Sequence, residues 1–411
     1  MYEGKIIKFY RKKEKLTQEQ LGEGVCSVTH ISKIERGLTE YSPEITVLLS
    51  KRLNINIEEE LANLKNLKIK LDYWHEVIIS RNMQEALRIN NELANNQLFE
   101  ISEHVTYYKL LQAKFNVIKG NLKKAKKLIE QIQVSHNHLS IYETNLFKHI
   151  LGLYYMSIDE HIKSVDTLNS IDFKNYSDPS IYYDLGAAYH SVHSPVLAYY
   201  YAEKALNFFR KTNQFLRIID TENLMLIQVE SDQHRDFKNT VEQYENLINL
   251  CELCNAPDKK AKVLHNFAYE HLRREKYQRA GQLYKESMEL KDRTSTLYLL
   301  SLDGYIRSAL KGKFLPQEEL QMLVNEGLTI ATDSADTMYE SIFTLHQFSI
   351  LQQEEHYYSY LATKVLPYFN GNGYTMIAQS YKRDLFNYYT KNGHTKKALE
   401  IATSMINAEE F

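Results

Sequence analysis

The order of apolar and polar residues along the 411-residue chain predicts helices almost throughout. Apolar residues recur three and four positions apart, which places them on one face of a helix. No long stretch alternates apolar with polar residues, as a half-buried strand would. Only 14 glycines and 6 prolines interrupt the pattern, and most prolines fall between the apolar-periodic segments. The chain is therefore predicted to be all-α.

Residues 16–37, LTQEQLGEGVCSVTHISKIERG, predict two short helices joined by a tight turn. Thr17 can cap a helix that begins at Gln18, and Gln20 can complete a capping box. Ser27 can cap the second helix after the turn.

Glycine and proline mark the ends of these elements. Gly24 lies at the turn, and Gly37 can end the second helix in the left-handed conformation. Ser42 and Pro43 predict the start of a further helix. The side chains expected to face inward are Leu16, Leu21, Val25, Ile31, Ile34, Ile45, Leu48, Leu49 and Leu53. This arrangement predicts a helix-turn-helix.

The segment resembles the small helix-turn-helix domains of phage repressors and many bacterial regulators, whose pattern is TQxxLA…ISxIExG. It carries TQEQLG and ISKIERG, with Gly22 where that family usually has alanine. The resemblance implies that Val28, Thr29 and Lys33 reach base edges, and that an arginine matching Arg11 pairs with Glu35. The implied DNA-binding residues are Gln18, Ser27, Val28, Thr29, His30, Ser32, Lys33 and Arg36, with Gln18 and Ser27 on phosphates. The alternative for each is a solvated surface side chain. Dimerisation is expected, because one such module contacts about half a site.

From about residue 67, small and aromatic residues recur in a pattern typical of tetratricopeptide hairpins, as in LGAAY (185–189) followed by Ala198 and Ala205. We expect nine degenerate hairpins that start near residues 67, 106, 145, 179, 218, 261, 297, 338 and 379. A generic α-solenoid is the alternative. In either case the first helix of each hairpin should line a concave groove.

Side-chain amides in such a groove can hold the backbone of an extended peptide, because they both donate and accept hydrogen bonds. Asn223 and Asn266 are the first candidates. The full predicted peptide-binding set is Asp184, Asn223, Lys262, His265, Asn266, Asp303, Arg307 and Asn387. The alternative is that these side chains only bridge neighbouring helices.

Composition and charge exclude several classes of protein. The chain is 44% hydrophobic and 25% charged, as expected of a folded protein, and no apolar run approaches a membrane span. Residues 1–57 carry 10 Lys and Arg against 7 Glu, a net of +3, which leaves −5 for the remainder. A basic head on an acidic body fits a small nucleic-acid module. With three cysteines and no signal-peptide pattern, the expected compartment is the cytoplasm.

Catalytic motifs do not stand out. Cys251 and Cys254 have CxxC spacing without a second pair, and are expected to end a helix of the fifth hairpin. His190 and His193 have no third ligand nearby in the sequence. Phosphate-binding, zincin and nucleophile-elbow motifs are missing, so we expect no enzyme activity, no cofactor and no metal site.

The order of the two regions resembles the peptide-responsive quorum-sensing regulators of Gram-positive bacteria, and in length and repeat number the neutral protease regulators of bacilli. The resemblance implies a helix-turn-helix domain at 1–57, a helical linker at 58–70 and a right-handed tetratricopeptide superhelix at 71–411. The implied partners are double-stranded DNA, a short signalling peptide and further copies of the chain as a dimer or tetramer, without a membrane. The peptide would switch the oligomeric state or the spacing of the heads. The alternative function is to sequester a response regulator of a sporulation-type phosphorelay.

Overall fold

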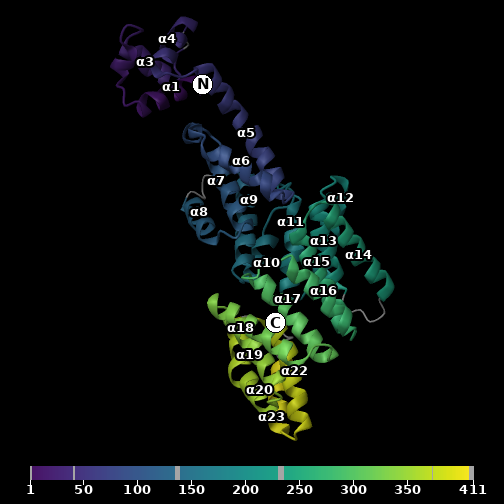
Figure 1. Cartoon of the computed structure of the whole chain (residues 1–411). Helices are drawn as coiled ribbons and strands as arrows, with labels where there is room; N and C mark the ends of the chain where they lie inside the picture. Colours follow the sequence, from purple (N-terminus) through teal and green to yellow (C-terminus); the bar gives the residue numbers. More distant parts are fainter. Residues whose placement is uncertain (1, 40–41, 135–138, 230–235, 373, 407–411) are drawn as a thin grey trace. The chain divides into compact units, whose positions relative to one another are not determined.

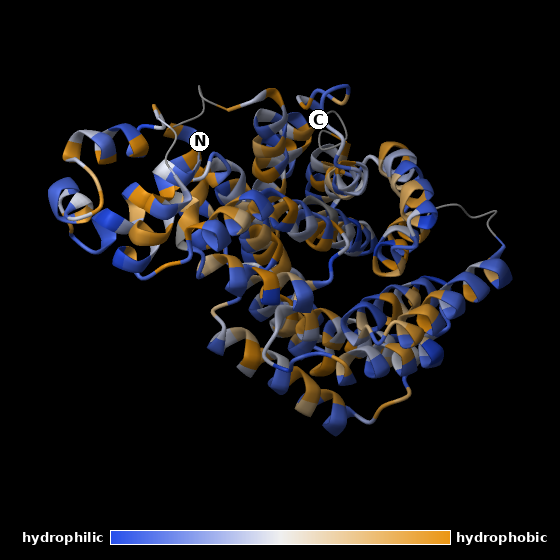
Figure 2. Ribbon diagram, turned by 90° about the horizontal axis from the view of Figure 1, so that it is seen from above, coloured by the Kyte–Doolittle hydropathy of each residue, from blue (hydrophilic) through white to orange (hydrophobic). Residues whose placement is uncertain are grey.

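The computed structural model describes residues 2–39, 42–134, 139–229, 236–372 and 374–406, and these residues form helices and no β-strand (Figure 1). The all-α prediction is confirmed. The chain divides into two compact units, Met1–Asp184 and Leu185–Phe411. Hydrophobic and hydrophilic residues alternate around the helices (Figure 2). No helix in the described ranges is long and apolar enough to cross a membrane.

The head of the first unit contains four helices, α1 (Tyr2–Lys13), α2 (Gln18–Gly22), α3 (Val28–Glu35) and α4 (Pro43–Leu53). The predicted capping box is present, because Gln20 N donates to Thr17 Oγ1 (3.1 Å) and Thr17 N donates to Gln20 Oε1 (2.8 Å). Ser27 Oγ caps α3 by accepting from His30 N (3.2 Å). Each short helix thus begins where its own side chains satisfy the first amide groups.

The predicted inward face of the head is confirmed with one exception. Ile7, Leu21, Ile31, Ile34, Leu49, Leu53 and Ile57 form its buried cluster. Leu48 was expected inward but is 44% exposed. On α4 the residues that face the cluster are four apart, Ile45, Leu49 and Leu53, and Leu48 lies beside that row. Ser42 precedes α4 as predicted, but its side chain makes no capping hydrogen bond.

Gly4 is a residue of the head that the sequence interpretation did not single out. A Cβ on Gly4 would collide with the carbonyl oxygen of Ile34, near the end of α3. Glycine therefore allows α1 and α3 to approach this closely, since any other side chain would push backbone away from backbone.

The repeat array comprises nine helical hairpins within the described residues. Eight of them begin within about one helical turn of the predicted positions. Their helix pairs are α5 (Ile57–Ile79) with α6 (Met83–Ala94), α7 (Val105–Ile118) with α8 (Leu122–Val134), α9 (Ile141–Ser157) with α10 (His161–Asn169), α11 (Ser180–Ser191) with α12 (Pro195–Lys211), α13 (Phe215–Gln228) with α14 (Phe237–Leu253), α15 (Pro257–Arg273) with α16 (Tyr277–Glu289), α17 (Thr296–Gly312) with α18 (Gln317–Asp333), α19 (Thr337–Ile350) with α20 (Glu354–Tyr360), η3 (Leu361–Val365) and α21 (Leu366–Gly371), and α22 (Thr375–Lys391) with α23 (Thr395–Ile406).

The first hairpin differs from the prediction. Its first helix, α5, begins at Ile57 rather than near residue 67, and residues 58–70, the expected linker, are its N-terminal half. Ile57 is buried in the core of the head. Farther along α5, Leu64 packs against Ile6 of α1 and Leu98 of the short helix η1 (Gln97–Ile101). One continuous helix therefore belongs to both the head and the array.

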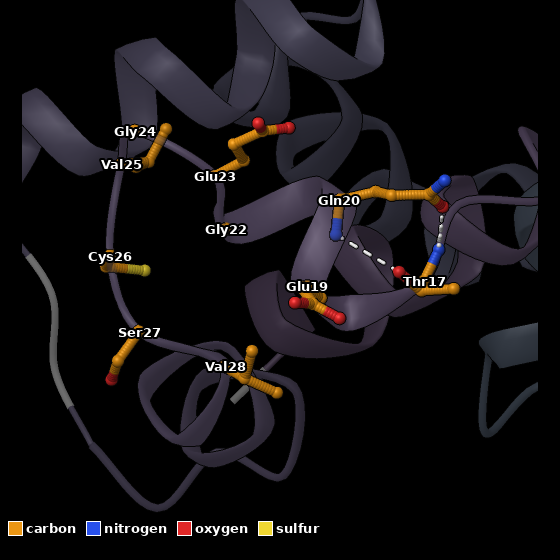
Figure 3. Close-up of a pocket in the computed structure, with 10 residues that line it drawn as sticks. All are labelled: Thr17, Glu19, Gln20, Gly22, Glu23, Gly24, Val25, Cys26, Ser27 and Val28. Carbon is orange, nitrogen blue, oxygen red and sulfur yellow. Dashed lines mark hydrogen bonds between the residues drawn. The ribbon is translucent and has the colours of Figure 1, made fainter.

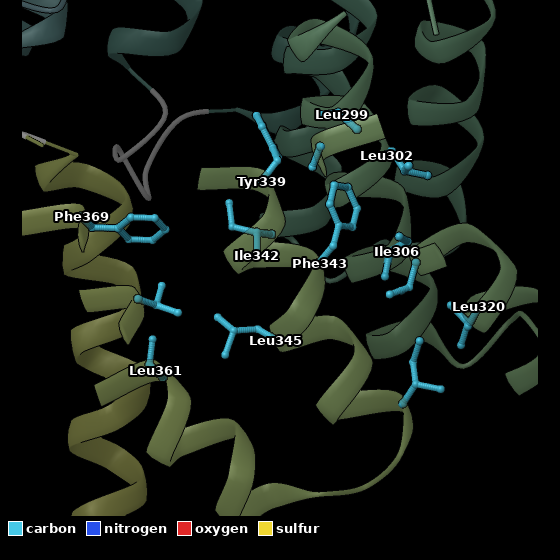
Figure 4. Packing of buried hydrophobic residues seen from close by; sticks show 14 of the residues in the cluster. Leu299, Leu302, Ile306, Leu320, Tyr339, Ile342, Phe343, Leu345, Leu361 and Phe369 are labelled. Atoms are coloured by element: carbon cyan, nitrogen blue, oxygen red, sulfur yellow. The ribbon is translucent and has the colours of Figure 1, made fainter. Parts of the chain in front are cut away.

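The second unit is held by apolar residues from successive hairpins. Leu299, Leu302 and Ile306 of α17 face Ile342 and Phe343 of α19 (Figure 4). Leu361 and Phe369, from the second arm of the eighth hairpin, join the same cluster. Each hairpin buries its apolar face against its neighbours, as expected for a repeat array.

Candidate functional site

The outward face of α3 presents the side chains predicted to contact DNA. Val28 is 44% exposed, and Thr29, Lys33 and Arg36 are exposed as well. His30 and Ser32, also in the predicted set, are half-buried. Ile31 and Ile34 are buried on the opposite face, so α3 is anchored by one side and open on the other.

A hollow of about 830 Å³ lies beside this helix, where α2 turns into α3 (Figure 3). Thr17, Gln20, Ser27 and Val28 line it, together with the residues of the turn. Gly22 is buried there, and a Cβ on it would lie 3.1 Å from Ile31 Cγ1, so the site requires a very small residue. The hollow places the exposed N-terminus of α3 and its hydroxyl groups on one open surface, suitable for phosphate and base contacts.

Buried polar contacts within the head fix the position of this surface. Arg11 Nη2 donates to Glu35 Oε2 (3.1 Å) and Nη1 to the Leu16 carbonyl (2.7 Å), so the predicted structural pairing of Arg11 with Glu35 is present. Gln18, a predicted phosphate contact, donates through Nε2 to Glu35 (2.9 Å). One of its amide hydrogens is therefore used within the head, and only the other could reach a phosphate.

Arg52 is a further residue that the sequence interpretation missed. Its Nη1 donates to the carbonyls of Leu21 (3.0 Å) and Gln20 (3.3 Å) at the end of α2. A cation at a helix C-terminus satisfies orphan carbonyls and the helix dipole. Since Arg52 lies 31 residues after Leu21, no local pattern could have indicated this contact.

In the second unit, the first helices of consecutive hairpins pack side by side, α13 with α15, α15 with α17, and α17 with α19. Two predicted groove residues meet in this layer, because Asn266 Nδ2 donates to Asn223 Oδ1 (3.0 Å). Asn223 is buried and Asn266 half-buried. The two amides form one pair that orients them, rather than two separate contacts.

The other predicted residues of this unit differ in exposure. Lys262 and Asn387 are exposed, whereas His265 is half-buried and its Nδ1 lies 2.9 Å from Ser301 Oγ. Burial lowers the pKa of His265 to about 3, so it is neutral near pH 7. These residues stay predictions for peptide contacts.

Asp303 and Arg307 lie one turn apart on α17. Asp303 is buried, and its Oδ1 lies 2.7 Å from His346 Nε2, across on α19. Burial opposes ionisation of Asp303, but the hydrogen bond from His346 and the nearby Arg307 keep its pKa below the ordinary value. Arg307 Nη1 is 3.7 Å from Asp303 Oδ2, and 37% of the Arg307 side chain is exposed.

Asp184 belongs to the first unit and is built into a buried polar network. His149 Nε2 lies 2.9 Å from Asp184 Oδ2, and Arg81 Nη2 is 3.7 Å from Asp184 Oδ1. A carboxylate only accepts, so His149 donates through Nε2 and its Nδ1 accepts from the hydroxyl of Tyr176 (2.8 Å). Asp184 is therefore engaged within its own unit, which favours a structural role for it.

The centre of this network is an ion pair between Lys114 and Asp178, whose side chains are 1% and 0% exposed. Asp178 also accepts from His75 Nε2 (3.1 Å) and from Ser180 N (2.9 Å) at the start of α11. Burial opposes ionisation of Asp178, but the Lys114 ammonium and His75 hold its pKa well below the ordinary value. The network thus joins α5, α7 and α9 to the first turn of α11 inside the protein.

The CxxC cysteines lie where the sequence predicted, at the end of α14 in the fifth hairpin. Cys251 is buried in an apolar cluster, and burial raises the pKa of its thiol to about 12. Such a thiol is a packing residue rather than a nucleophile.

Comparison with known proteins identifies the head. Residues 7–59 match the helix-turn-helix family. The N-terminal module is a helix-turn-helix domain. Over 399 residues the chain is 24% identical to the transcriptional activator NprA of Geobacillus stearothermophilus, a match that covers 92% of this chain and 96% of NprA. The chain thus resembles a transcriptional regulator over nearly its whole length.

Solved structures share the fold of the array. The quorum sensor NprR of B. thuringiensis in its apo form has a TM-score of 0.65 at 19% identity, and NprR in complex with its cognate peptide NprX has 0.67 at 18%. These matches cover 84% of this chain and 99% and 100% of those chains. A Rap protein complexed with Competence and Sporulation Factor has a TM-score of 0.71 at 14% identity, covering 84% of this chain and 98% of that one.

Proposed function

We propose that this protein is a cytoplasmic transcriptional regulator that binds operator DNA through its helix-turn-helix and a short signalling peptide through its repeat array. The observation that carries the proposal is α5, which is part of the head core at Ile57 and part of the array from Leu67 onward. One continuous helix can carry a displacement of the array to the head, because a helix is a rigid element. The likeness to NprA, a transcriptional activator, and to NprR, solved with a peptide, supports the same assignment.

In this proposal DNA is read by the exposed face of α3. Lys33 can donate to guanine O6 or N7, and the methyl groups of Val28 and Thr29 can contact thymine. One head contacts a half-site, so the protein acts as a dimer or larger homo-oligomer whose head spacing matches the operator. Peptide binding shifts the population between assemblies with different spacing, which is how it controls transcription.

The DNA assignment is tested with the double variant Thr29→Ala/Lys33→Ala. Operator fragments are first selected from genomic DNA by the wild-type protein, and affinity is then measured by fluorescence anisotropy across a salt series. We expect a loss of about tenfold or more and a shallower salt slope. The matched control is Lys12→Ala, an exposed lysine of α1 outside the predicted set. Equal affinity of the double variant and the wild type would remove α3 from the interface.

The peptide assignment is tested with Asn266→Ala. Short synthetic peptides are selected from a random pool on the wild-type protein, and the best binder is titrated by calorimetry. Loss of the Asn266 amide should weaken binding about tenfold, because a peptide backbone group would lose its partner and Asn223 its orientation. The control is Asn325→Ala on α18, an exposed amide of a second helix. Unchanged affinity of Asn266→Ala would exclude this pair from the site.

A second candidate function is the capture of a response regulator protein, since the array has the fold of a Rap protein. The two functions differ in what the head does. A sequestering protein would bind a response regulator tightly and DNA only weakly and without sequence preference, so the DNA selection described above separates them. The exposed predicted contacts on α3 favour the DNA-binding regulator.

A further inference from the structure

Arg307 stands out among the charged residues of the second unit. Its guanidinium makes no hydrogen bond to any other residue that the structure describes, and its one ion contact, to Asp303, is 3.7 Å long. Asp303 is already held by His346 at 2.7 Å. A guanidinium has five N–H donors in a planar fork, and those of Arg307 are left for another acceptor.

The surroundings of Arg307 come from several hairpins. Tyr269 of α15, Tyr284 of α16 and Tyr381 of α22 lie near it, as does Asp303 one turn away. The side chain thus lies near residues of three other helices, α15, α16 and α22, and is still 37% exposed. Arg307 is therefore a partly exposed cation that lies among residues of neighbouring hairpins.

Two carboxylates lie near this cation, Asp303 at 3.7 Å and Asp384 of α22. Burial raises the pKa of Asp384, the other acidic group facing Arg307. Lys311 lies one turn beyond Arg307 on α17, on the same helix face, and also interacts with Asp384. Two cations one turn apart therefore lie on the same face of α17.

We infer that Arg307 is the anchor for a carboxylate of the bound peptide, either its C-terminus or an Asp or Glu side chain. This inference rests on the proposed peptide-binding function and adds the chemistry of one subsite. The planar fork of arginine matches a carboxylate with two parallel hydrogen bonds, and a tyrosine-lined, partly desolvated position strengthens both. In this proposal Asn223, two hairpins earlier, and Asn266, one hairpin earlier, hold the peptide backbone, whereas Arg307 selects for charge.

The test uses pools of fluorescein-labelled short peptides in three forms: with a free C-terminus, with an amidated C-terminus, and with Asp and Glu replaced by their amides. Anisotropy titrations compare the wild type with Arg307→Met and Arg307→Lys. The matched control is Arg279→Met, an exposed arginine on α16, a second helix. Arg307→Met removes the 3.7 Å ion contact to the buried Asp303, so thermal melting of each variant is measured beside peptide binding, and Arg307→Lys, which keeps the charge, controls for that loss.

We expect the wild type to bind the pool that keeps all its carboxylates about ten- to a hundredfold more tightly than one of the two amide-containing pools. Arg307→Met should lose that preference. Arg307→Lys should retain a part of it, because it keeps charge and loses the fork. Loss with the amidated C-terminus assigns the C-terminal carboxylate, and loss with the side-chain amides assigns an acidic residue. If the wild type binds peptides without any preference for a carboxylate, the inference is wrong and the proposed function stands. If the wild type binds no pool, both are wrong.

Discussion

The most informative perturbation of the first unit is Asp178→Asn. The substitution preserves the shape of the side chain but removes the only negative charge that contacts Lys114 among the residues that the structure describes, and both side chains are almost completely buried. An amide also presents a donor where Asp178 now accepts from Ser180 N and His75 Nε2. Removing one partner of a buried ion pair costs about 3 to 5 kcal/mol, because the remaining charge stays buried without compensation.

This magnitude can be converted into a measurable shift. With a urea dependence of about 2 kcal/mol/M, a loss of about 4 kcal/mol moves the unfolding midpoint by about 2 M. Trp74 is the only tryptophan of the chain, and it is fully buried on α5, so its fluorescence reports on the first unit alone. The assay is urea unfolding of the full-length protein at pH 7, followed by Trp74 emission.

Two further variants make the result interpretable. Glu92→Gln makes the same chemical change in an exposed ion pair with Arg88, and should leave the midpoint nearly unchanged. The double variant Asp178→Asn/Lys114→Met should regain much of the lost stability, because the uncompensated charge is gone. If Asp178→Asn shifts the midpoint no more than Glu92→Gln does, the ion pair does not hold this unit together.

Three other changes have expected outcomes. Gly4→Ala should unfold the head and abolish DNA binding, because a methyl group would collide with a carbonyl of α3. The array should keep most of its helical circular dichroism, and normal DNA affinity of the variant would contradict this prediction. Arg52→Ala should destabilise the head by about 1 kcal/mol, because the carbonyl groups at the end of α2 lose their donor. The measurement is the melting temperature of a head fragment, or the temperature at which the full-length protein loses DNA binding. Burial and Lys114 lower the pKa values of His75 and His149 in the folded state. Below about pH 6.5 the unfolded state therefore takes up protons that the folded state does not, and acid favours unfolding. The Trp74 urea midpoint should therefore fall between pH 7 and pH 5, and a constant or rising midpoint would exclude neutral histidines.

The head could be predicted from the sequence because its determinants are local. Thr17 and Gln20 are three residues apart, and the capping box that they form needs no distant partner. Leu48 was misplaced because its spacing from Ile45 fits a helix face as well as that of Leu49 does. Only packing against the rest of the head decides between the two.

For the array, the sequence indicated where most hairpins begin but not which polar side chains meet. Small and aromatic residues recur with each repeat, and their spacing locates most helix starts. His75 and Asp178, in contrast, are 103 residues apart, and no periodic signal connects them. The Asn223–Asn266 pair spans 43 residues, so the sequence indicated two amides but not their mutual hydrogen bond. The limits 1–57, 58–70 and 71–411 remain a proposal, since α5 runs through two of them.

The continuous helix α5 also has a mechanical consequence. Its 23 residues give it a length of about 34 Å. Its far end carries Trp74 and His75 in the buried layer of the array, whereas its near end is fixed in the head by Ile57. A tilt of about 10° at the far end would displace the near end by about 6 Å, close to the rise of two DNA base pairs. A change in hairpin packing can thus be too small to disturb any core. It would still displace a head far enough along the DNA to leave its half-site.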